Sequence, residues 1–449
     1  MHRGFDVGGT SVMTSVTLPF RSWGGLTTAR TRREYLAWKN DPLPRHEGAL
    51  LAYGMGRSYG DSCLLDDGVM IETRMLDHIL EFDAIAGVVR CEAGCSMAGL
   101  LDFCVPHGWF PPVTPGTKWV TLGGCVANDV HGKNHHVAGT FGCFVNRLGL
   151  RRSDGTTLEC SLTCNQDFFR ATIGGLGLTG VILWVELRLK RIRTSQITQR
   201  LSRLRGIDAF FDCFQQNEKM PEYSVAWLDT SHAGEPRGLL ISGDHAGDSD
   251  ELIVRGAHPK LSLPVMLPDF VLGPDAIRLM NRIYYAANSG KRAVKNVHYD
   301  PFFYPLDAVG NWNRAYGKKG LVQYQFVVPK NYGKDVLVET LAKARLAGHA
   351  SFLTVVKMFG SIVSPGLLSF PRPGVTVCFD FPNLGDRTAR LLEDMDHTVF
   401  SAGGALYPAK DCRMSRDAFE RSFPAHDAFK SLIDPACSSS FAKRTGLTA

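Results

Sequence analysis

The sequence lacks a long apolar run, a block of like charge and an apolar segment near its start. No stretch of the 449 residues is apolar over about 18 positions, the length that a bilayer-spanning helix needs, so we expect no transmembrane helix. The first twenty residues, MHRGFDVGGTSVMTSVTLPF, contain no continuous apolar core and do not indicate a secretory signal. Lysine and arginine (50) exceed aspartate and glutamate (44) without forming a basic tail, so nucleic acid is not an expected partner.

The twelve cysteines are too dilute for a disulfide scaffold, and none is arranged as CxxC. Two CxxxC pairs, Cys91 with Cys95 and Cys160 with Cys164, do not have the spacing of a zinc knuckle. We therefore expect reduced thiols in a cytoplasmic protein. Such a protein could work peripherally at the inner face of the membrane without spanning it.

The chain is long enough for two or three domains, and its 44% hydrophobic and 21% charged residues are typical of a soluble globular protein. Residues 49–192 show short β-branched runs between glycine turns, whereas residues 194–404 show longer amphipathic helices between strands. From Ala405 a strand precedes polar helical segments. The patterns predict strands at 69–73, 87–94, 178–192, 321–329 and 351–360, and helices at 95–105, 165–172 and 334–348.

Four glycine-rich segments interrupt the first half of the chain. They are YGMGRSYGDS (Tyr53–Ser62), PGTKWVTLGGCVAND (Pro115–Asp129), HGKNHHVAGTFG (His131–Gly142) and TIGGLGLTG (Thr172–Gly180). Glycine lets backbone N–H groups approach an anion without a Cβ in the way. One such loop is an ordinary turn, but four interleaved with strands indicate a large phosphate-bearing cofactor.

The last of these loops also matches GxGxxG, at Gly175, Gly177 and Gly180. A dinucleotide fingerprint of the Rossmann type needs a strand before it, a helix after it and an acidic residue about 20 positions on. Here a helical pattern precedes the loop and a strand follows it, and no acidic residue lies between Glu186 and Asp208. We therefore do not assign a Rossmann domain.

The motifs GMGRSYGDS, PGT, GG, HGKNHH and GGLGLTG together resemble the flavin-binding domain of the vanillyl-alcohol-oxidase superfamily. Within it, HGKNHHVAGTFG, WNRAYG, QYQFVVP, SFPRPGVTVCFDFP and YPAKD are similar to the decaprenylphosphoryl-β-D-ribose 2′-oxidase family, over Ser22 to Gly446. The resemblance implies an α+β, two-domain PCMH-type FAD-binding fold. Residues 1–191 would form the FAD-binding domain, residues 192–404 an inserted substrate domain of a sheet flanked by helices, and residues 405–449 a segment returning to the first domain.

The resemblance also implies which residues touch FAD. They are Gly54, Met55, Gly56, Arg57, Ser58, Tyr59, Gly60, Asp61, Gly116, Thr117, Leu122, Gly123, Gly124, Cys125, His131, Gly132, Asn134, Ile182 and Tyr407. Some flavoproteins of this superfamily carry a histidine in the first loop that is covalently joined to the flavin. Arg57 or a neighbour takes that place here, and no histidine lies between His46 and His78. We expect noncovalent FAD.

Two residues are the expected catalytic groups. His131, with His135 and His136, could form a metal site, but Gly132 and the missing HExxH glutamate favour a flavin loop, so no metal is expected. Lys410 alone would be read as a surface lysine paired with Asp411; the resemblance instead places its ammonium beside the flavin and the reacting hydroxyl, where a cation stabilises a developing alkoxide.

Eight residues are expected at the substrate. Gln323 and Gln325 share one face of a strand and suit hydroxyl recognition, although a sheet edge gives the same pattern. Lys357 is a lone charge in an apolar strand, which favours a substrate phosphate or an ordered acid as its partner. Cys378 would otherwise be an ordinary core thiol. The resemblance makes Cys378 a pocket-lining residue and adds four more: Lys133, Trp227, Arg314 and Phe359.

Three positions depart from the family pattern near the expected substrate pocket. Phe303 and Tyr304 stand where the mycobacterial enzymes usually have tyrosine and then histidine, and Thr376 replaces an asparagine. The apolar, proline-broken stretch Leu261–Gly273, continuing to about Ala293, falls in a region that is a mobile lid in the family; the other interpretation is a core-packing loop. As a lid it would shield the site and meet a prenyl chain.

The family resemblance implies an FAD-dependent oxidoreductase that oxidises the 2′-hydroxyl of a polyprenylphosphoryl-β-D-ribose to the 2′-keto sugar. An NAD(H)-dependent short-chain reductase would complete epimerisation to an arabinose donor for cell-envelope glycoconjugates. Quinone or oxygen would accept the electrons. Two alternatives remain open: a sugar-alcohol or aldonolactone oxidase acting on a soluble substrate, and a noncatalytic scaffold for a partner reductase.

Overall fold

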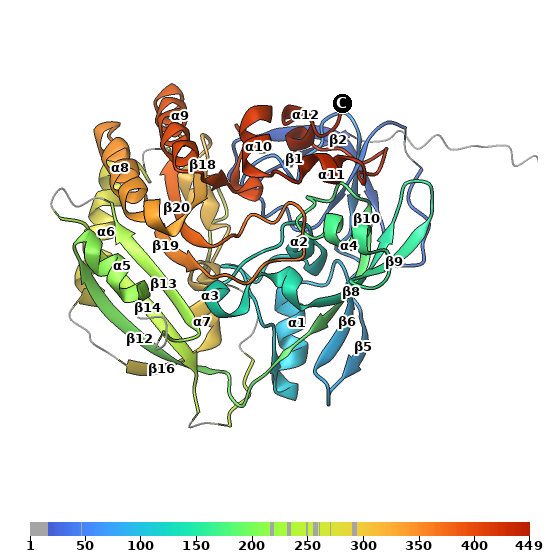
Figure 1. The fold of residues 1–449 in the computed structure, drawn as a ribbon, viewed down its shortest axis with the longest axis horizontal. Coiled ribbons are helices and arrows are strands. Elements are labelled where there is room, and N and C mark those ends of the chain that lie inside the picture. Colours follow the sequence, from blue (N-terminus) through green and yellow to red (C-terminus); the bar gives the residue numbers. More distant parts are fainter. Residues whose placement is uncertain are drawn as a thin grey trace, which may run out of the picture.

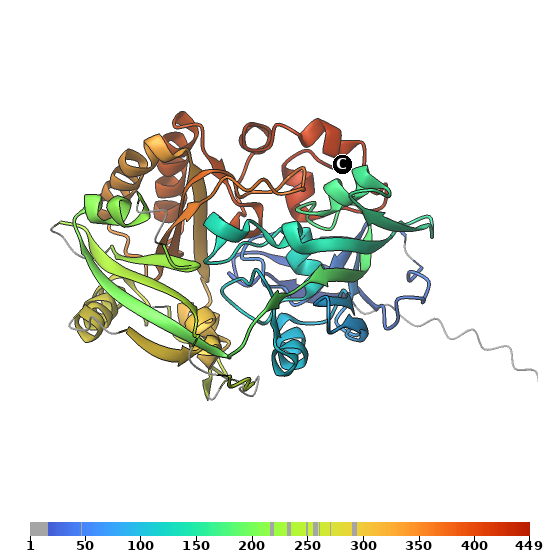
Figure 2. The same ribbon diagram turned by 60° about the horizontal axis from the view of Figure 1, so that its bottom comes forward.

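The computed structural model describes residues 17–449 except 46, 216–219, 231–234, 248–249, 255–258, 260, 270 and 290–293. The fold is α+β, and two lobes lie side by side in both views (Figures 1 and 2). The first part of the chain and its C-terminal helices build one lobe, and the middle of the chain builds the other.

The first part of the chain contributes two larger sheets, a two-stranded ribbon and four short helices to the first lobe. The four-stranded sheet has the order β1 (Thr17–Arg21), β2 (Thr28–Tyr35), β4 (Val69–Glu72), β3 (Leu50–Tyr53), with β4 parallel to both neighbours. The antiparallel five-stranded sheet has the order β5 (Ile79–Asp83), β6 (Val88–Glu92), β10 (Val181–Arg188), β8 (Val145–Arg151), β9 (Thr157–Ser161). The helices are α1 (Met97–Cys104), α2 (Leu122–Ala127), α3 (His135–Ala138) and α4 (Gln166–Thr172). A short ribbon pairs β7 (Trp109–Phe110) with β11 (Lys190–Arg191).

The second lobe is built on one antiparallel eight-stranded sheet. Its order is β16 (Val294–His298), β12 (Gln196–Arg205), β14 (Arg237–His245), β13 (Tyr223–Asp229), β19 (Thr354–Phe359), β20 (Gly374–Pro382), β18 (Leu321–Val328), β21 (Ala405–Leu406). Its larger helices are α5 (Ile207–Gln215), α6 (Pro274–Ser289), α8 (Gly333–Leu346) and α9 (Asp386–Ser401). A one-turn helix α7 (Tyr299–Phe303) and a parallel pair, β15 (Leu261–Ser262) with β17 (Val309–Gly310), lie in its connections.

Apolar side chains alternate with Thr, Cys and Asp side chains along β20, which gives the large sheet two different faces. Val375, Val377, Phe379 and Phe381 are fully buried in the core cluster that also contains α8 and α9 residues. Because successive side chains of a strand point to opposite faces, Thr376, Cys378 and Asp380 must point the other way. That second face is turned toward the first lobe.

The C-terminal segment joins the two lobes. β21 hydrogen-bonds to β18, so residues 405–406 complete the large sheet. The chain then forms α10 (Arg416–Ser422), α11 (His426–Lys430) and α12 (Ser440–Arg444) on the first lobe, where Leu50 N–H donates to the Ala436 carbonyl (2.7 Å). From this path we propose domain boundaries near residues 191/192 and 404/405.

Most elements expected from the sequence are present. The predicted helices at 95–105, 165–172 and 334–348 are confirmed as α1, α4 and α8, and the predicted strands as β4, β6, β10, β18 and β19. Ser96 caps α1 by accepting from the Gly99 N–H (3.0 Å), as its place before the apolar run suggests. Within the described part of the chain, no helix combines the length and apolarity needed to cross a bilayer.

Candidate active site

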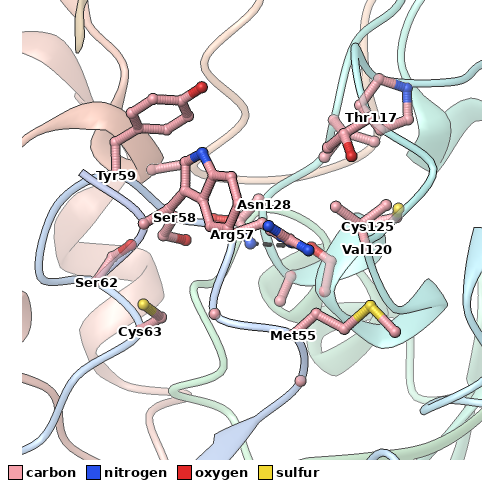
Figure 3. A pocket seen from close by; sticks show the side chains of 18 of the residues that line it. Met55, Arg57, Ser58, Tyr59, Ser62, Cys63, Thr117, Val120, Cys125 and Asn128 are labelled. Atoms are coloured by element: carbon pink, nitrogen blue, oxygen red, sulfur yellow. Dashed lines mark hydrogen bonds between the residues drawn. The ribbon is translucent and has the colours of Figure 1, made fainter. Parts of the chain in front are cut away.

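A cavity of about 330 Å³ lies where the two lobes and the C-terminal segment meet. Its walls come from the glycine loops of the first lobe, from one face of the large sheet and from the turn that carries Lys410. This volume is in the range of small-molecule and cofactor sites. In Figure 3 the Met55–Tyr59 loop lies on one side of the space and Thr117, Val120 and Cys125 lie on the other.

The cavity brings together most of the residues that the sequence singles out. From the first lobe and the tail they are Gly54–Tyr59, Gly116, Thr117, Gly123–Cys125, His131, Ile182, Tyr407 and Lys410. From the large sheet they are Gln323, Gln325, Lys357 and Cys378. Residues more than 300 positions apart therefore share one enclosed space.

The other predicted residues lie behind or beside this wall. Gly60 packs on the Asp411 carbonyl, and Asp61 accepts from Arg444 (2.7 Å). The remaining cofactor candidates off the wall are Leu122, Gly132 and Asn134, and the substrate candidates off it are Lys133, Trp227, Arg314 and Phe359. Phe359 contacts the His131 ring (4.8 Å between centroids), Trp227 packs on Tyr284 of α6, and Arg314 donates to the Pro264 carbonyl (2.5 Å).

The first-lobe wall combines glycine-loop backbone with side chains such as Met55 and Cys125. The N–H groups of Met55, Gly56 and Arg57 have no acceptor among the described residues. Gly56 has φ +59, and a Cβ on Gly54 would overlap the Thr121 hydroxyl, which itself caps α2. These donors and the tight approach suit a phosphate-bearing group.

The side chain of Arg57 is already engaged. Its guanidinium lies 3.8 Å from the centre of the Trp23 ring, and its Nε donates to the Trp119 carbonyl (3.0 Å). Burial lowers the pKa of Arg57, and the nearby Asp307 carboxylate partly restores it. Asp307 also accepts from the Thr117 hydroxyl (2.7 Å) and the Lys118 N–H (2.8 Å), which fixes the PGT loop against the second lobe.

The large-sheet wall is made of polar side chains in register. Gln325 lies opposite Cys378, Gln323 opposite Asp380, and Lys357 opposite Thr376. The Gln325 amide nitrogen lies 3.1 Å from His131 Nε2, and Lys357 Nζ lies 3.3 Å from His131 Nδ1. Burial is the main reason that the pKa of His131 lies well below its usual value, with Lys357 adding to the effect.

Three lysines around this wall are partly buried, and none has a carboxylate within ion-pair distance among the described residues. Burial lowers the pKa of Lys133 to about 7, that of Lys357 to about 8, and that of Lys410 by a smaller margin. Lys133 donates to the Phe303 carbonyl (3.1 Å), and Lys410 Nζ lies 4.0 Å from the centre of the Tyr59 ring. Because buried ammonium groups need compensation, the site is electrostatically prepared for an anion.

Asp380 is a residue of this site that the sequence reasoning missed. It is completely buried, its Oδ1 accepts from Gln323 Nε2 (2.6 Å), and its Oδ2 has no partner among the described residues. Burial raises its pKa to about 7, although Gln323 and Lys410 oppose the shift. The i, i+2 spacing from Cys378 was the available signal, because it places both on one strand face.

The three residues that depart from the family pattern occupy buried positions. Tyr304 shares a hydrogen bond with the Thr114 hydroxyl (2.5 Å), Phe303 packs edge-on against Tyr223, and Thr376 contacts Gln325. In the expected lid, Leu261 and Val265 are more than 60% exposed, whereas Leu272 is buried. Phe270 and the end of the lid at Ala293 lie outside the described residues.

Comparison with known proteins bears on the identity of the site. Residues 43–161 match the FAD binding domain family. Over 403 residues, 86% of this chain and 86% of the relative, the chain is 33% identical to the decaprenylphosphoryl-beta-D-ribose oxidase of Mycolicibacterium smegmatis. The chain belongs to this oxidase family. The family assignment makes the protein an FAD-dependent oxidoreductase with a PCMH-type FAD-binding fold.

Two further relatives of the protein differ in how much of their length aligns with it. An uncharacterized protein in the mprA 5′ region of Streptomyces coelicolor is 31% identical over 371 residues, 78% of this chain and 99% of the relative. L-gulonolactone oxidase of Mus musculus is 34% identical over only 137 residues, 30% of each chain. The free loop donors and the cavity fit the FAD that the family binds.

Proposed function

We propose that this flavoenzyme oxidises the 2′-hydroxyl of a polyprenylphosphoryl-β-D-ribose to the 2′-keto sugar. The observation that carries the proposal is a group of three partly buried lysines with no carboxylate at ion-pair distance among the described residues: Lys357 and Lys410 line the cavity, and Lys133 lies behind its wall. A sugar phosphate would supply the negative charge that the Lys133 ammonium lacks. The two glutamine amides on the same wall supply donors and acceptors for ribose hydroxyls.

The predicted cofactor residues would bind different parts of FAD along the first-lobe wall. We propose that the Gly54–Asp61 loop and the Leu122–Cys125 turn hold the pyrophosphate. Gly116, Thr117, the His131–Asn134 segment, Ile182 and Tyr407 would line the rest of the FAD channel. When bound, FAD supplies the acceptor for the carbon-bound hydrogen and its electron pair.

Lys410 and His131 would act on the reacting hydroxyl. The Lys410 ammonium sits on the Tyr59 ring, where it is held for contact with oxygen. A cation at this place stabilises the negative charge that develops as the hydroxyl loses its proton. The neighbouring residues Cys378, Phe359, Trp227 and Arg314 would shape the pocket rather than take part in proton transfer.

The test is anaerobic mixing of the yellow protein with farnesylphosphoryl-β-D-ribose. Loss of the 450-nm flavin band on mixing is the expected result, and farnesylphosphoryl-2-deoxy-β-D-ribose, which lacks the reacting hydroxyl, is the matched control. Bleaching by a free sugar alcohol or an aldonolactone, with none by the lipid sugar, would overturn the proposal in favour of a soluble substrate. A protein that stays yellow with every substrate would favour a noncatalytic scaffold.

We propose that the FAD is bound noncovalently, because by the family resemblance Arg57 or a neighbour takes the place of a covalently joined histidine, and Arg57 is engaged with Trp23 and Trp119. Acid precipitation should then release all of the yellow colour into the supernatant. A yellow pellet would contradict this, and digestion of the pellet would identify the attached residue.

The remaining proposals concern partners and place of action. We propose that an NAD(H)-dependent short-chain reductase consumes the keto product and that quinone or oxygen reoxidises the enzyme. The protein would work in the cytoplasm at the inner face of the membrane, with the Leu261–Gly273 stretch covering the prenyl chain. Limited proteolysis should show that the lipid sugar protects this stretch, and unchanged cleavage would contradict the lid.

A further inference from the structure

Thr376 begins a chain of hydrogen bonds on the large-sheet wall. Its side chain is 1% exposed, and its hydroxyl donates to the Phe326 carbonyl (2.8 Å). A hydroxyl has one hydrogen, so the Thr376 oxygen can only accept from its second neighbour. That neighbour is the Gln325 amide, 3.2 Å away, which must therefore present its nitrogen.

The same amide fixes the protonation of His131. The Gln325 amide nitrogen also lies 3.1 Å from His131 Nε2. This nitrogen donates its second hydrogen to Nε2, which is therefore an acceptor. Burial keeps the pKa of His131 well below the usual range, and the neutral ring carries a single proton. With Nε2 as the acceptor, that proton is on Nδ1.

Lys357 lies at the other end of this chain of hydrogen bonds. Its Nζ is 3.3 Å from His131 Nδ1, so an ammonium there would face an N–H donor. The other groups around Lys357 and His131 are Lys133, His135, Lys410 and Cys378, and the Asp380 carboxyl lies beyond them, where it interacts with Cys378 and Lys410. A neutral amine, in contrast, accepts the Nδ1 hydrogen through its lone pair. The lowered pKa of Lys357, about 8, agrees with this arrangement.

We propose that Thr376 and Gln325 are positioning residues that hold His131 in its Nδ1–H form, so that Lys357 is a neutral amine and takes the hydroxyl proton of the substrate. This inference rests on the proposed function. In the balanced step Lys357 releases the His131 Nδ1 hydrogen, the substrate O–H bond breaks and its proton joins the freed Lys357 lone pair, while a carbon–oxygen double bond forms. The carbon-bound hydrogen leaves with its electron pair to the flavin. Lys410 remains the cation that stabilises the oxygen.

The chain offers a matched pair of variants at Thr376. Thr376→Val has nearly the same shape but no hydroxyl, so the Gln325 amide can turn and offer its oxygen to His131. The proton then moves to Nε2, Nδ1 becomes an acceptor, and it stabilises the Lys357 ammonium. Thr376→Ser keeps the hydroxyl and should keep the wild-type state. Gln325→Leu removes the amide and should act like Thr376→Val.

Competitive acetylation measures the outcome without substrate. The flavin-loaded protein is labelled with acetic anhydride over pH 6–11, and the Lys357 peptide is quantified by mass spectrometry against peptides carrying surface lysines. We expect Lys357 to titrate near pH 8 in the wild type and in Thr376→Ser, and at least one pH unit higher in Thr376→Val and Gln325→Leu. Equal values in Thr376→Val and Thr376→Ser, or a wild-type value near 10.5, would overturn the inference.

The pH dependence of anaerobic flavin reduction gives a second readout. If Lys357 takes the proton, the reduction rate rises with pH through the Lys357 titration, and this limb moves to higher pH in Thr376→Val. If the Lys357 titration shifts in a variant but the rising limb of its pH–rate profile does not, Lys357 is not the proton acceptor. Absence of bleaching with every substrate would instead count against the proposed function, and the acetylation result would stand by itself.

Discussion

The two walls of the cavity are built by different means. The first-lobe wall is built on glycine loops: they carry N–H groups that have no acceptor among the described residues, and the tight approach of Gly54 to Thr121 leaves no room for a side chain at position 54. The large-sheet wall is side chain: Gln323, Gln325 and Lys357 reach the cavity from neighbouring strands. We infer that the first wall determines which cofactor binds and the second determines what is oxidised, so substitutions in the two walls should have separable effects.

The largest effect is expected at Lys410, which we propose serves the reaction and not cofactor binding. Lys410→Met should slow anaerobic flavin reduction by about 10²–10³-fold, the usual loss when one stabilising donor is removed. The FAD content should stay unchanged. Rapid mixing with the lipid sugar measures the rate, and Lys443→Met, at an exposed lysine, is the control. A rate within tenfold of the wild type would remove Lys410 from the reaction.

A smaller effect is expected at Lys133, on substrate affinity. Lys133→Met should raise the dissociation constant of the lipid sugar by about tenfold or more, since a charge-assisted contact contributes about 1.5–3 kcal/mol. Because the pKa of Lys133 is about 7 and the phosphate binds its ammonium form, wild-type affinity should fall as the pH rises above 7. Titration of the flavin spectrum measures both. An unchanged constant at every pH would contradict this role.

On the opposite wall, Gly54→Ala should affect the cofactor first. The added Cβ overlaps the Thr121 hydroxyl, and overpacking of this kind typically costs about 1–3 kcal/mol. We expect FAD to bind about tenfold more weakly, as measured by fluorescence during reconstitution of the apoprotein. Gly247→Ala is the control, because nothing lies within 4 Å of a Cβ there. Equal affinities in the two variants would contradict the close-packed loop.

A further effect, separate from catalysis and binding, is a pH-dependent change of stability at Asp380. Its folded-state pKa of about 7 lies above the ordinary 3.8, so the folded protein holds this proton more tightly than the unfolded chain does. The contribution of Asp380 to stability is therefore present at low pH and is lost as the pH rises from about 4 to 7. Asp380→Asn is neutral throughout, so its melting temperature relative to the wild type should rise across that window. A constant difference would show that Asp380 is already ionised.

The first wall could be predicted largely from the sequence, whereas the second could be predicted only in part. A glycine loop such as Gly54–Tyr59 can be recognised in the sequence, because the residues that let its backbone turn are consecutive. The polar face of the sheet depends on strand register, which pairs Gln323 with Asp380 across 57 positions. The i, i+2 spacing found the two glutamines, and the same spacing joins Asp380 to Cys378 in the run GVTVCFDFP, but it does not show that Gln323 pairs with this carboxylate. Arg314 and Trp227 were expected at the pocket, and tertiary packing places both off its wall.

The most direct test of the account is a kinetic isotope effect on flavin reduction. Farnesylphosphoryl-β-D-ribose carrying deuterium at C2′ should bleach the flavin severalfold more slowly than the unlabelled compound, and the same label at C3′ should have no effect. This result would place the reacting carbon between the two walls as proposed. A full isotope effect from C3′, or none from either position, would contradict the claim that the large-sheet wall presents the 2′-hydroxyl to the flavin.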